Sequence, residues 1–206
     1  RTWRALEFDD NQWESGQSGF GYGDGDDRTR LNDMRFYEDS PTEPGQPGYL
    51  SLFIRRTFEM RNKEDIEQLI LRVDYDDGFI AYLNGREVAR ANIEGAARFN
   101  TKAKGTHEAG SPEDFNITQH LGILNEGKNV LAVQVHNDKI TSNDLTIIPE
   151  FVQQTKLDVP PVMNRLVLFW SDDRVPHEVL PANAPRAACT LRLRKMRCTA
   201  AWSFQR

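Results

Sequence analysis

Three places in the sequence carry side chains that could bind a metal ion or an anion. The first is the acidic loop 23–27, which reads Gly-Asp-Gly-Asp-Asp. Calcium and similar hard cations prefer several carboxylate and carbonyl oxygens on a flexible turn. The loop lacks the regular carboxylate spacing of an EF-hand, so two interpretations stay open: a calcium site in the N-terminal part of the chain, and an acidic turn exposed to water.

The second place is the His-x-Asp sequence formed by His136 and Asp138, and the third is the stretch 164–190, which contains His177, Arg186 and Thr190. Imidazole nitrogens and carboxylates are the iron ligands of many oxygenases. The planar guanidinium group of an arginine can hold a carboxylate through two parallel hydrogen bonds. The third stretch therefore combines a side chain that can ligate a metal with one that can bind an anion.

Residues 164–186 read Asn-Arg-Leu-Val-Leu-Phe-Trp-Ser-Asp-Asp-Arg-Val-Pro-His-Glu-Val-Leu-Pro-Ala-Asn-Ala-Pro-Arg. This stretch resembles the closing strands of the prolyl-4-hydroxylase family, most closely its branch of oxygen-sensing hydroxylases. The resemblance implies a partial double-stranded β-helix, in which 166–170 form a buried strand and the next strand begins at Pro176.

The same resemblance implies a role for three residues. His177 corresponds to the second histidine of the iron-binding triad of two histidines and one carboxylate. Arg186 occupies the family's position for the arginine that binds the distal carboxylate of 2-oxoglutarate, and Thr190 occupies that of a hydroxyl beside it. The implied cofactors are iron(II) and 2-oxoglutarate, with ascorbate as a reductant, and the implied substrate is a prolyl residue of a peptide or protein.

His136 and Asp138 are the candidates for the other two iron ligands, because the family places a His-x-Asp upstream of the second histidine. Two observations count against them. His136 ends a run with strand character that belongs to the N-terminal part of the chain, and only 38 residues separate Asp138 from His177. The family's barrel needs about five strands in that interval, each of roughly 5–6 residues plus a turn.

The first 150 residues carry the pattern of a β-protein rather than of a helical one. Five runs rich in apolar and β-branched residues predict strands at 50–58, 68–74, 79–83, 129–136 and 145–151. The Asn84-Gly85 pair predicts a two-residue hairpin turn, because both central positions of such a turn need a positive φ. We expect the aromatic residues Trp13, Phe20 and Tyr82 to be core residues rather than a platform for sugars.

Several phrases of this part, among them Asp-Asp-Gly-Phe-Ile-Ala-Tyr-Leu-Asn-Gly at 76–85, occur in an order that resembles galactose-binding-like β-sandwich modules. The predicted fold class is therefore all-β: an antiparallel jelly-roll β-sandwich followed by a partial double-stranded β-helix segment. The predicted domains are the sandwich at 1–152, a linker at 153–163 marked by two consecutive prolines, and the dioxygenase fragment at 164–206.

The composition limits the classes of partner. A net charge of −5 and a pI of about 5.5 provide no overall basic field that would attract nucleic acid. No stretch approaches the roughly 20 apolar residues of a membrane helix. Cys189 and Cys198 form no disulfide framework and leave the compartment open. The sequence begins with Arg1, so we expect it to be a fragment of a longer protein.

Three functional hypotheses remain at this point. The chain could be a fragment of a prolyl hydroxylase preceded by a β-sandwich binding module. It could be a non-catalytic β-sandwich that binds a carbohydrate or a protein and carries a remnant of a dioxygenase. It could also be a purely structural sandwich, without ligand or catalysis.

Overall fold

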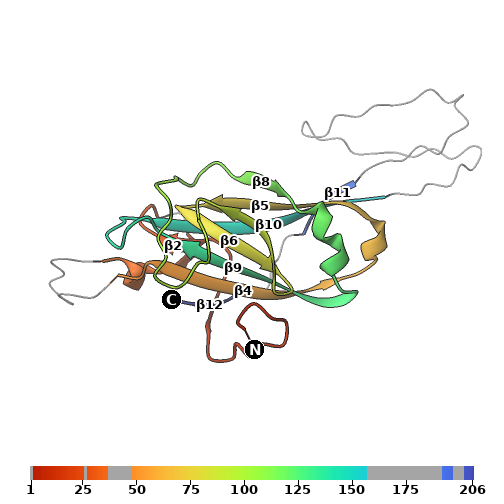
Figure 1. The fold of residues 1–206 in the computed structure, drawn as a ribbon, viewed down its shortest axis with the longest axis horizontal. Coiled ribbons are helices and arrows are strands. Elements are labelled where there is room, and N and C mark those ends of the chain that lie inside the picture. The colour runs from red at the N-terminus through yellow and green to blue at the C-terminus, as the bar shows by residue number, and fades with distance from the viewer. Residues whose placement is uncertain (1, 26, 37–47, 157–191, 197–201) are drawn as a thin grey trace, which may run out of the picture.

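The computed structural model describes residues 2–25, 27–36, 48–156 and 202–206, together with the backbone of 192–196 (Figure 1). These residues form two six-stranded β-layers that pack face to face. The three helices described are short 3-10 turns: η1 Asn32–Met34, η2 Lys63–Asp65 and η3 Thr118–Ile123. None of the helices in this part of the chain is long and apolar enough to cross a membrane.

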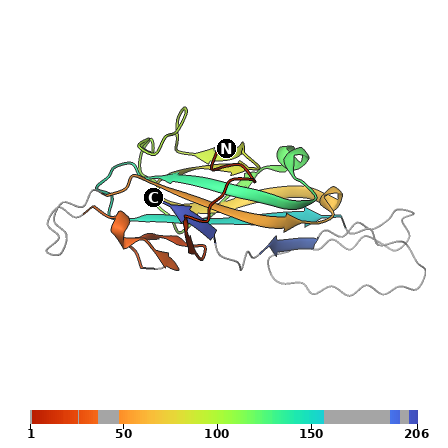
Figure 2. The ribbon, with the colours of Figure 1, turned by 90° about the horizontal axis from the view of Figure 1, so that it is seen from below.

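The first sheet has the strand order β1-β12-β4-β9-β6-β7, and every pairing in it is antiparallel. The strand bounds are β1 Glu14–Gly16, β12 Trp202–Gln205, β4 Ser51–Met60, β9 Gly127–His136, β6 Gly78–Leu83 and β7 Arg86–Ala91. Figure 2 shows β4 and β9 of this sheet in one layer and β10 in the other.

The second sheet has the order β3-β2-β10-β5-β8. The strand β2 pairs with 145–147 of β10, and β11 pairs with 151–155 of the same strand. The pairing of β2 with β3 is parallel, and the others are antiparallel. The strand bounds are β3 Thr29–Arg30, β2 Phe20–Tyr22, β10 Leu145–Thr155, β5 Ile66–Tyr75, β8 Glu113–Asn116 and β11 Arg192–Met196.

The core lies between the two sheets, where alternate residues of each strand point inward. Leu52 and Ile54 of β4 belong to the same buried cluster as Leu69 and Leu71 of β5. Phe20 of β2 packs against Phe204 of β12 with ring centroids 5.3 Å apart. The burial of these side chains from both sheets supplies most of the free energy that holds the layers together.

The outer face of the first sheet is also buried, which explains why β9 is almost continuously apolar. Ala132 of β9 and the outward-facing Ile80 and Tyr82 of β6 form a second cluster with Ile93. Trp3 packs on this cluster and meets the Tyr82 ring edge to face at 5.8 Å. The N-terminal segment and the 92–104 segment therefore cover a face that would otherwise be exposed to water.

The predicted all-β antiparallel sandwich is confirmed, and the five predicted strands correspond to β4, β5, β6, β9 and β10. The predicted hairpin turn joins β6 to β7, with φ of 49° at Asn84 and 84° at Gly85. Phe20 and Tyr82 are buried as expected, and Trp13 is half-buried. The jelly-roll connectivity and the β-helix segment stay predictions.

The C-terminal strand β12 is an unexpected member of the first sheet. Residues 164–206 were predicted to form the dioxygenase fragment, but Ser203 pairs with Ser15 of β1 on one side and with Arg55 of β4 on the other. Trp202 and Phe204 belong to the core cluster. The sandwich therefore includes 202–205, and β10 also continues to Thr155, beyond the predicted boundary at 152.

Candidate functional site

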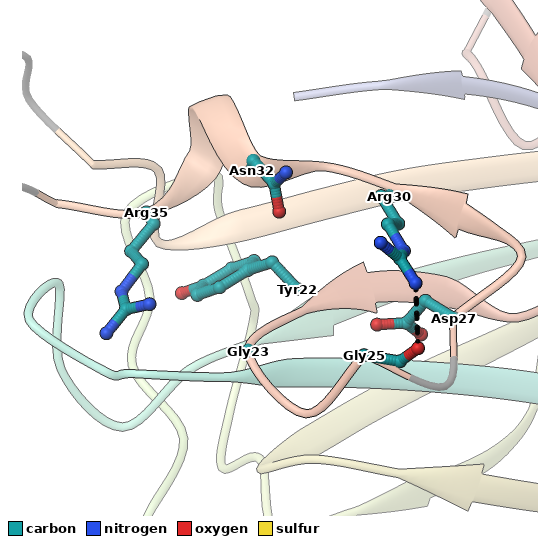
Figure 3. A pocket seen from close by; sticks show the side chains of 7 residues that line it. All are labelled: Tyr22, Gly23, Gly25, Asp27, Arg30, Asn32 and Arg35. Atoms are coloured by element: carbon teal, nitrogen blue, oxygen red, sulfur yellow. Dashed lines mark hydrogen bonds between the residues drawn. The ribbon is translucent and has the colours of Figure 1, made fainter.

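A polar pocket of about 200 Å³ opens beside the end of β2 (Figure 3). Its lining comes from β2, from the loop that follows, from β3 and from η1 with the residue after it. The lining residues are Tyr22, Gly23, Gly25, Asp27, Arg30, Asn32 and Arg35. Among the described residues, the lining thus comes from one short segment, 22–35.

Close packing of the loop against the chain before β10 shapes this pocket. Gly23 has a φ of 115°, and a Cβ there would lie 2.4 Å from the carbonyl oxygen of Asn143. A Cβ at Gly21 would lie 1.9 Å from the carbonyl oxygen of Leu145. Only glycine fits at these positions. Across the loop, Arg30 Nη2 donates a hydrogen bond of 2.9 Å to the carbonyl oxygen of Gly25.

The pocket presents cationic donors around a buried acceptor. Figure 3 shows the guanidinium group of Arg30 beside Asp27, and that of Arg35 on the hydroxyl side of Tyr22. The Asp27 side chain is buried, whereas Arg30 and Asn32 are exposed. Guanidinium groups bind carboxylates in a fixed planar geometry, and carboxylate and amide groups bind hydroxyls. The lining therefore suits a ligand that has both an anionic group and hydroxyls.

Tyr22 connects this pocket to the interior. Its hydroxyl accepts a hydrogen bond of 2.9 Å from Asn137 Nδ2 and lies 3.4 Å from the carbonyl oxygen of Ser142. Burial raises the pKa of Tyr22 to about 12, and the nearby carboxylates of Asp144 and Asp76 act in the same direction. The phenol therefore stays protonated at neutral pH.

A separate group of acidic side chains could hold a metal ion. Oxygen atoms of Asp76, Glu108 and Asp144 all lie within 4.8 Å of one another. The acidic loop at 23–27, for which a calcium site is one of two interpretations, lines the pocket through Gly23, Gly25 and Asp27.

Three predicted site residues, His177, Arg186 and Thr190, lie outside the described residues. The two others lie at the end of β9. His136 is fully buried, and its Nδ1 lies 2.7 Å from the carbonyl oxygen of Thr101. Because a carbonyl oxygen only accepts, Nδ1 carries the proton, and Nε2 has no hydrogen-bond partner among the described residues. Burial lowers the pKa of His136 to about 4, so the ring is neutral at neutral pH.

Asp138 follows β9 and is held through its backbone. Its amide N–H donates a hydrogen bond of 2.7 Å to Asp77 Oδ2. Within the described ranges, the cluster of three metal-ligating side chains contains neither His136 nor Asp138. The iron-ligand prediction for these two residues stays a prediction.

Sequence reasoning missed the basic half of the pocket. Arg30 and Arg35 stand in a stretch without apolar periodicity, and nothing in their spacing links them to Tyr22. The available signal was the glycine-rich phrase Gly-Phe-Gly-Tyr-Gly at 19–23, because such a density of glycine indicates close backbone contacts.

No protein-family model matches the chain. The chain is 47% identical over 53 residues to "Egl nine homolog 1" of Homo sapiens, a match that covers 26% of this chain and 12% of that protein. It is 45% identical over 53 residues to "Prolyl hydroxylase EGLN3" of Mus musculus, which covers 26% of this chain and 22% of that protein. It is also 47% identical over 47 residues to the "Hypoxia-inducible factor prolyl hydroxylase" of Caenorhabditis elegans, with coverages of 23% and 6%.

These matches show a short local similarity to prolyl hydroxylases. The chain spans less than a quarter of the length of each of these three relatives.

Among solved structures, the described fold is similar to β-glucuronidase 2 of Bacteroides uniformis, with a TM-score of 0.42 and 16% identity over 76% of this chain and 20% of that one. It is also similar to the α-L-rhamnosidase of Streptomyces avermitilis, with a TM-score of 0.38 and 23% identity over 54% of this chain and 10% of that one.

Proposed function

We propose that this chain is a non-catalytic β-sandwich that binds an acidic glycan in the pocket of Tyr22, Arg30 and Arg35. The observation that carries the proposal is the pocket lining, which combines two guanidinium groups with a buried carboxylate, an amide and a protonated phenol. An acidic sugar presents the complementary groups, a carboxylate surrounded by hydroxyls. Charge-assisted hydrogen bonds to that carboxylate would provide the orientation.

The size of the pocket limits the ligand. Its volume of about 200 Å³ lies below the roughly 300–1,000 Å³ that is usual for sites of drug-sized ligands. We therefore expect the pocket to hold one sugar unit, at a chain end or on a branch. Recognition of a single unit predicts weak affinity for one site, which a multivalent display would raise.

A glycan array tests this proposal with the full chain, because β12 belongs to the sandwich. We expect binding to glycans that carry uronic or sialic acids, and none to their neutral counterparts. Arg35→Met should weaken that binding about 10- to 100-fold, since a hydrogen bond to a charged group contributes about 1.5–3 kcal/mol. Arg61→Met, at an exposed position outside the pocket, is the matched control.

Two outcomes would reject the glycan proposal. One is an array on which the folded chain binds no glycan at all, which would leave the structural hypothesis. The other is binding that Arg35→Met and Arg30→Met leave unchanged, because the ligand would then contact a different surface.

The second candidate function is prolyl hydroxylation, and the similarity of 45–47% over about 50 residues to prolyl hydroxylases favours it. We assign these matched residues to the C-terminal part of the chain, where the family's phrases stand. His177 would then bind iron(II), and Arg186 with Thr190 would bind 2-oxoglutarate. When bound, the iron would supply the oxidative chemistry, and these side chains would hold and orient the two cofactors.

The described candidates for the remaining iron ligands do not suit that site. His136 is completely buried in the sandwich, and the backbone amide of Asp138 is tied to Asp77. A dioxygenase iron needs open coordination positions that an oxo-acid and oxygen can reach. We therefore expect the 206-residue chain not to convert 2-oxoglutarate.

Succinate formation decides between the two functions. The purified chain would be supplied with iron(II), ascorbate, 2-oxoglutarate and a proline-containing peptide, and we expect no succinate above background. Clear turnover that His177→Ala abolishes would establish the dioxygenase function instead, with His120→Ala as the histidine control.

A further inference from the structure

Three distant segments bring acidic side chains together near the end of β5. Asp76 directly follows β5, Glu108 lies in the loop before β8, and Asp144 directly precedes β10. One oxygen from each carboxylate lies within 4.8 Å of the other two. Like charges at such distances repel one another unless a proton or a cation lies between them.

Asp76 is the buried member of this cluster, and a buried carboxylate needs a group that neutralises its charge. Its exposure is only 5%, and the side chain that its carboxyl group contacts most directly is another carboxyl group, that of Asp77. The neighbouring Asp77 is equally buried but accepts bonds from the amide N–H groups of His107, at 2.9 Å, and of Asp138, at 2.7 Å. A buried carboxylate that faces other carboxylates is strongly unfavourable unless a cation or a proton neutralises it.

The loop that carries Glu108 is fixed on both sides of that residue. Before it, the His107 ring stacks on Tyr75 at a centroid distance of 4.0 Å, and the His107 amide donates to Asp77. After it, the Gly110 amide donates a hydrogen bond of 2.7 Å to Asp74 Oδ1. Glu108 itself is exposed, so its carboxylate reaches the cluster from the solvent side. The backbone thus holds the exposed Glu108 on the solvent side of the buried Asp76.

We propose that Asp76, Glu108 and Asp144 bind a divalent cation of the calcium class. The ligand atoms are all carboxylate oxygens, which hard cations prefer, and the cluster includes no histidine or cysteine that would favour zinc. Calcium tolerates the irregular geometry that ligands from three separate segments produce, whereas magnesium requires a nearly ideal octahedron. Backbone carbonyl oxygens and water would complete its coordination shell.

The position of the cation would also support the pocket, and this consequence rests on the proposed glycan function. Asp144 adjoins Asn143, whose carbonyl oxygen packs against Gly23 of the pocket. The Tyr22 hydroxyl contacts Ser142 from the same segment. A cation that fixes Asp144 would therefore hold the segment on which the pocket is built.

Calcium titration of the full chain tests the site without any glycan. After treatment with a chelator, isothermal titration calorimetry with CaCl₂ should give one site per chain, and binding of MgCl₂ should be at least tenfold weaker. Glu108→Gln and Asp144→Asn should each reduce the calcium affinity at least tenfold. Glu67→Gln, which removes an exposed carboxylate of β5, should leave it unchanged.

Glu108→Gln is the decisive variant because the exposed side chain is not needed for folding, which circular dichroism would verify. Absence of calcium binding in the unmodified chain would overturn the proposal, as would equal affinity in Glu108→Gln and Glu67→Gln. A glycan affinity that calcium does not change, together with normal calcium binding, would reject only the link to the pocket. Calcium binding on a chain that binds no glycan would leave the cation site intact and reject the proposed function.

Discussion

Arg55 and Asp76 both have ionisable side chains buried in the sandwich, with exposures of 1% and 5%, but their surroundings are opposite. Arg55 Nη1 forms an ion pair of 2.6 Å with Asp10, and Nη2 donates a hydrogen bond of 3.0 Å to the carbonyl oxygen of Ala5. The guanidinium group also lies 5.3 Å from the centroid of the Phe8 ring. Asp76 instead faces Asp77, Asp144 and Glu108.

The difference separates two ways of keeping a charge inside a protein. The N-terminal segment folds over Arg55 and supplies its counter-charge through Asp10, so the fold itself pairs this buried charge. The end of β5 gathers negative charge that the described residues do not balance, so that region depends on protons or cations from the solution. A buried ionisable group that is paired within the fold indicates a structural role. A buried group that the fold leaves without an opposite charge indicates a binding site for an ion.

The largest expected effect concerns Arg55. Arg55→Met leaves Asp10 and the carbonyl oxygens of 5 and 8 without their donor, and we expect the free energy of unfolding to fall by about 3–4 kcal/mol. Urea denaturation of the full chain would measure it, with the exposed Arg61→Met as the control. A loss no greater than that of the control would mean that the N-terminal segment does not stabilise the buried guanidinium.

His136 is a third buried group, and it avoids charge by staying neutral. Its folded-state pKa of about 4 lies below the value of 6.5 expected when unfolded. Between pH 6.5 and 4 the unfolded chain therefore binds a proton at this ring that the folded chain does not bind. This contribution is fully present above pH 6.5 and is lost as the pH falls through about 4. It amounts to about 3 kcal/mol, at 1.36 kcal/mol per pKa unit.

We therefore expect His136→Gln to flatten the loss of stability between pH 6.5 and 4. Denaturation at several pH values would show this as a difference between the variant and the unmodified chain. His120→Gln should keep the original pH profile. An unaltered profile in His136→Gln would show that the ring does not titrate in this way.

The next effect concerns Asp76 in the absence of calcium. Burial, together with the charges of Asp77 and Asp144, raises its pKa from 3.8 to about 8. Between these two values the folded chain keeps a proton that the unfolded chain has released, so stability falls as the pH rises from 4 to 8. Asp76→Asn has no such proton and should be more stable than the unmodified chain at pH 8 with a chelator. The full shift would correspond to about 5–6 kcal/mol, but the cluster is open to solvent at Glu108, which screens its charges, so we expect about 2 kcal/mol.

Calcium should reverse the order of the two proteins. Saturating calcium stabilises the chain that binds it, and Asp76→Asn lacks one ligand. Thermal denaturation at pH 8, with chelator and with calcium, measures both signs. Lower stability of Asp76→Asn under both conditions would mean that groups of the fold stabilise the Asp76 carboxylate, as they stabilise the guanidinium group of Arg55.

The smallest expected effect is at a surface pair that resembles neither buried charge. Arg72 and Asp114 form two hydrogen bonds of 2.6 and 2.7 Å with side chains 34% and 42% exposed. We expect a coupling energy of about 0.5 kcal/mol, because water and salt screen exposed pairs. A double-mutant cycle with Arg72→Met and Asp114→Asn would measure it, and a coupling above about 1.5 kcal/mol would contradict this explanation.

The long strands could be predicted from the sequence because each carries its own pattern of apolar residues. β9 continues as Val-Leu-Ala-Val-Gln-Val, and the Asn84-Gly85 pair has the one chemistry that a tight hairpin prefers. The short strands β1, β2, β3 and β12 contain two to four residues, too few to show a period. The placement of β12 between β1 and β4 depends on long-range packing of Trp202 and Phe204.

The candidate sites were less predictable than the fold. Asp76, Glu108 and Asp144 are separated by about thirty residues each, and only the folded backbone brings their carboxylates together. The acidic loop at 23–27 was recognised by its composition, but its role in a pocket depends on Arg30 and Arg35. The ligands of the cluster come from three distant segments, so their spacing carries no signal. The residues of the pocket lie within 22–35, but their side chains meet only because β2, β3 and η1 fold this segment back on itself.

The position of β12 has a consequence for how the protein is made. β12 lies between β1 and β4, so β1 has no place in the sheet until residues 202–205 have left the ribosome. Synthesis of the 46 residues between β10 and β12 takes roughly 2–10 seconds at about 5–20 residues per second. Throughout that interval one edge of β4 is available to other extended chains. The pairing of β12 with β4 therefore removes an edge that could otherwise pair with another chain during synthesis.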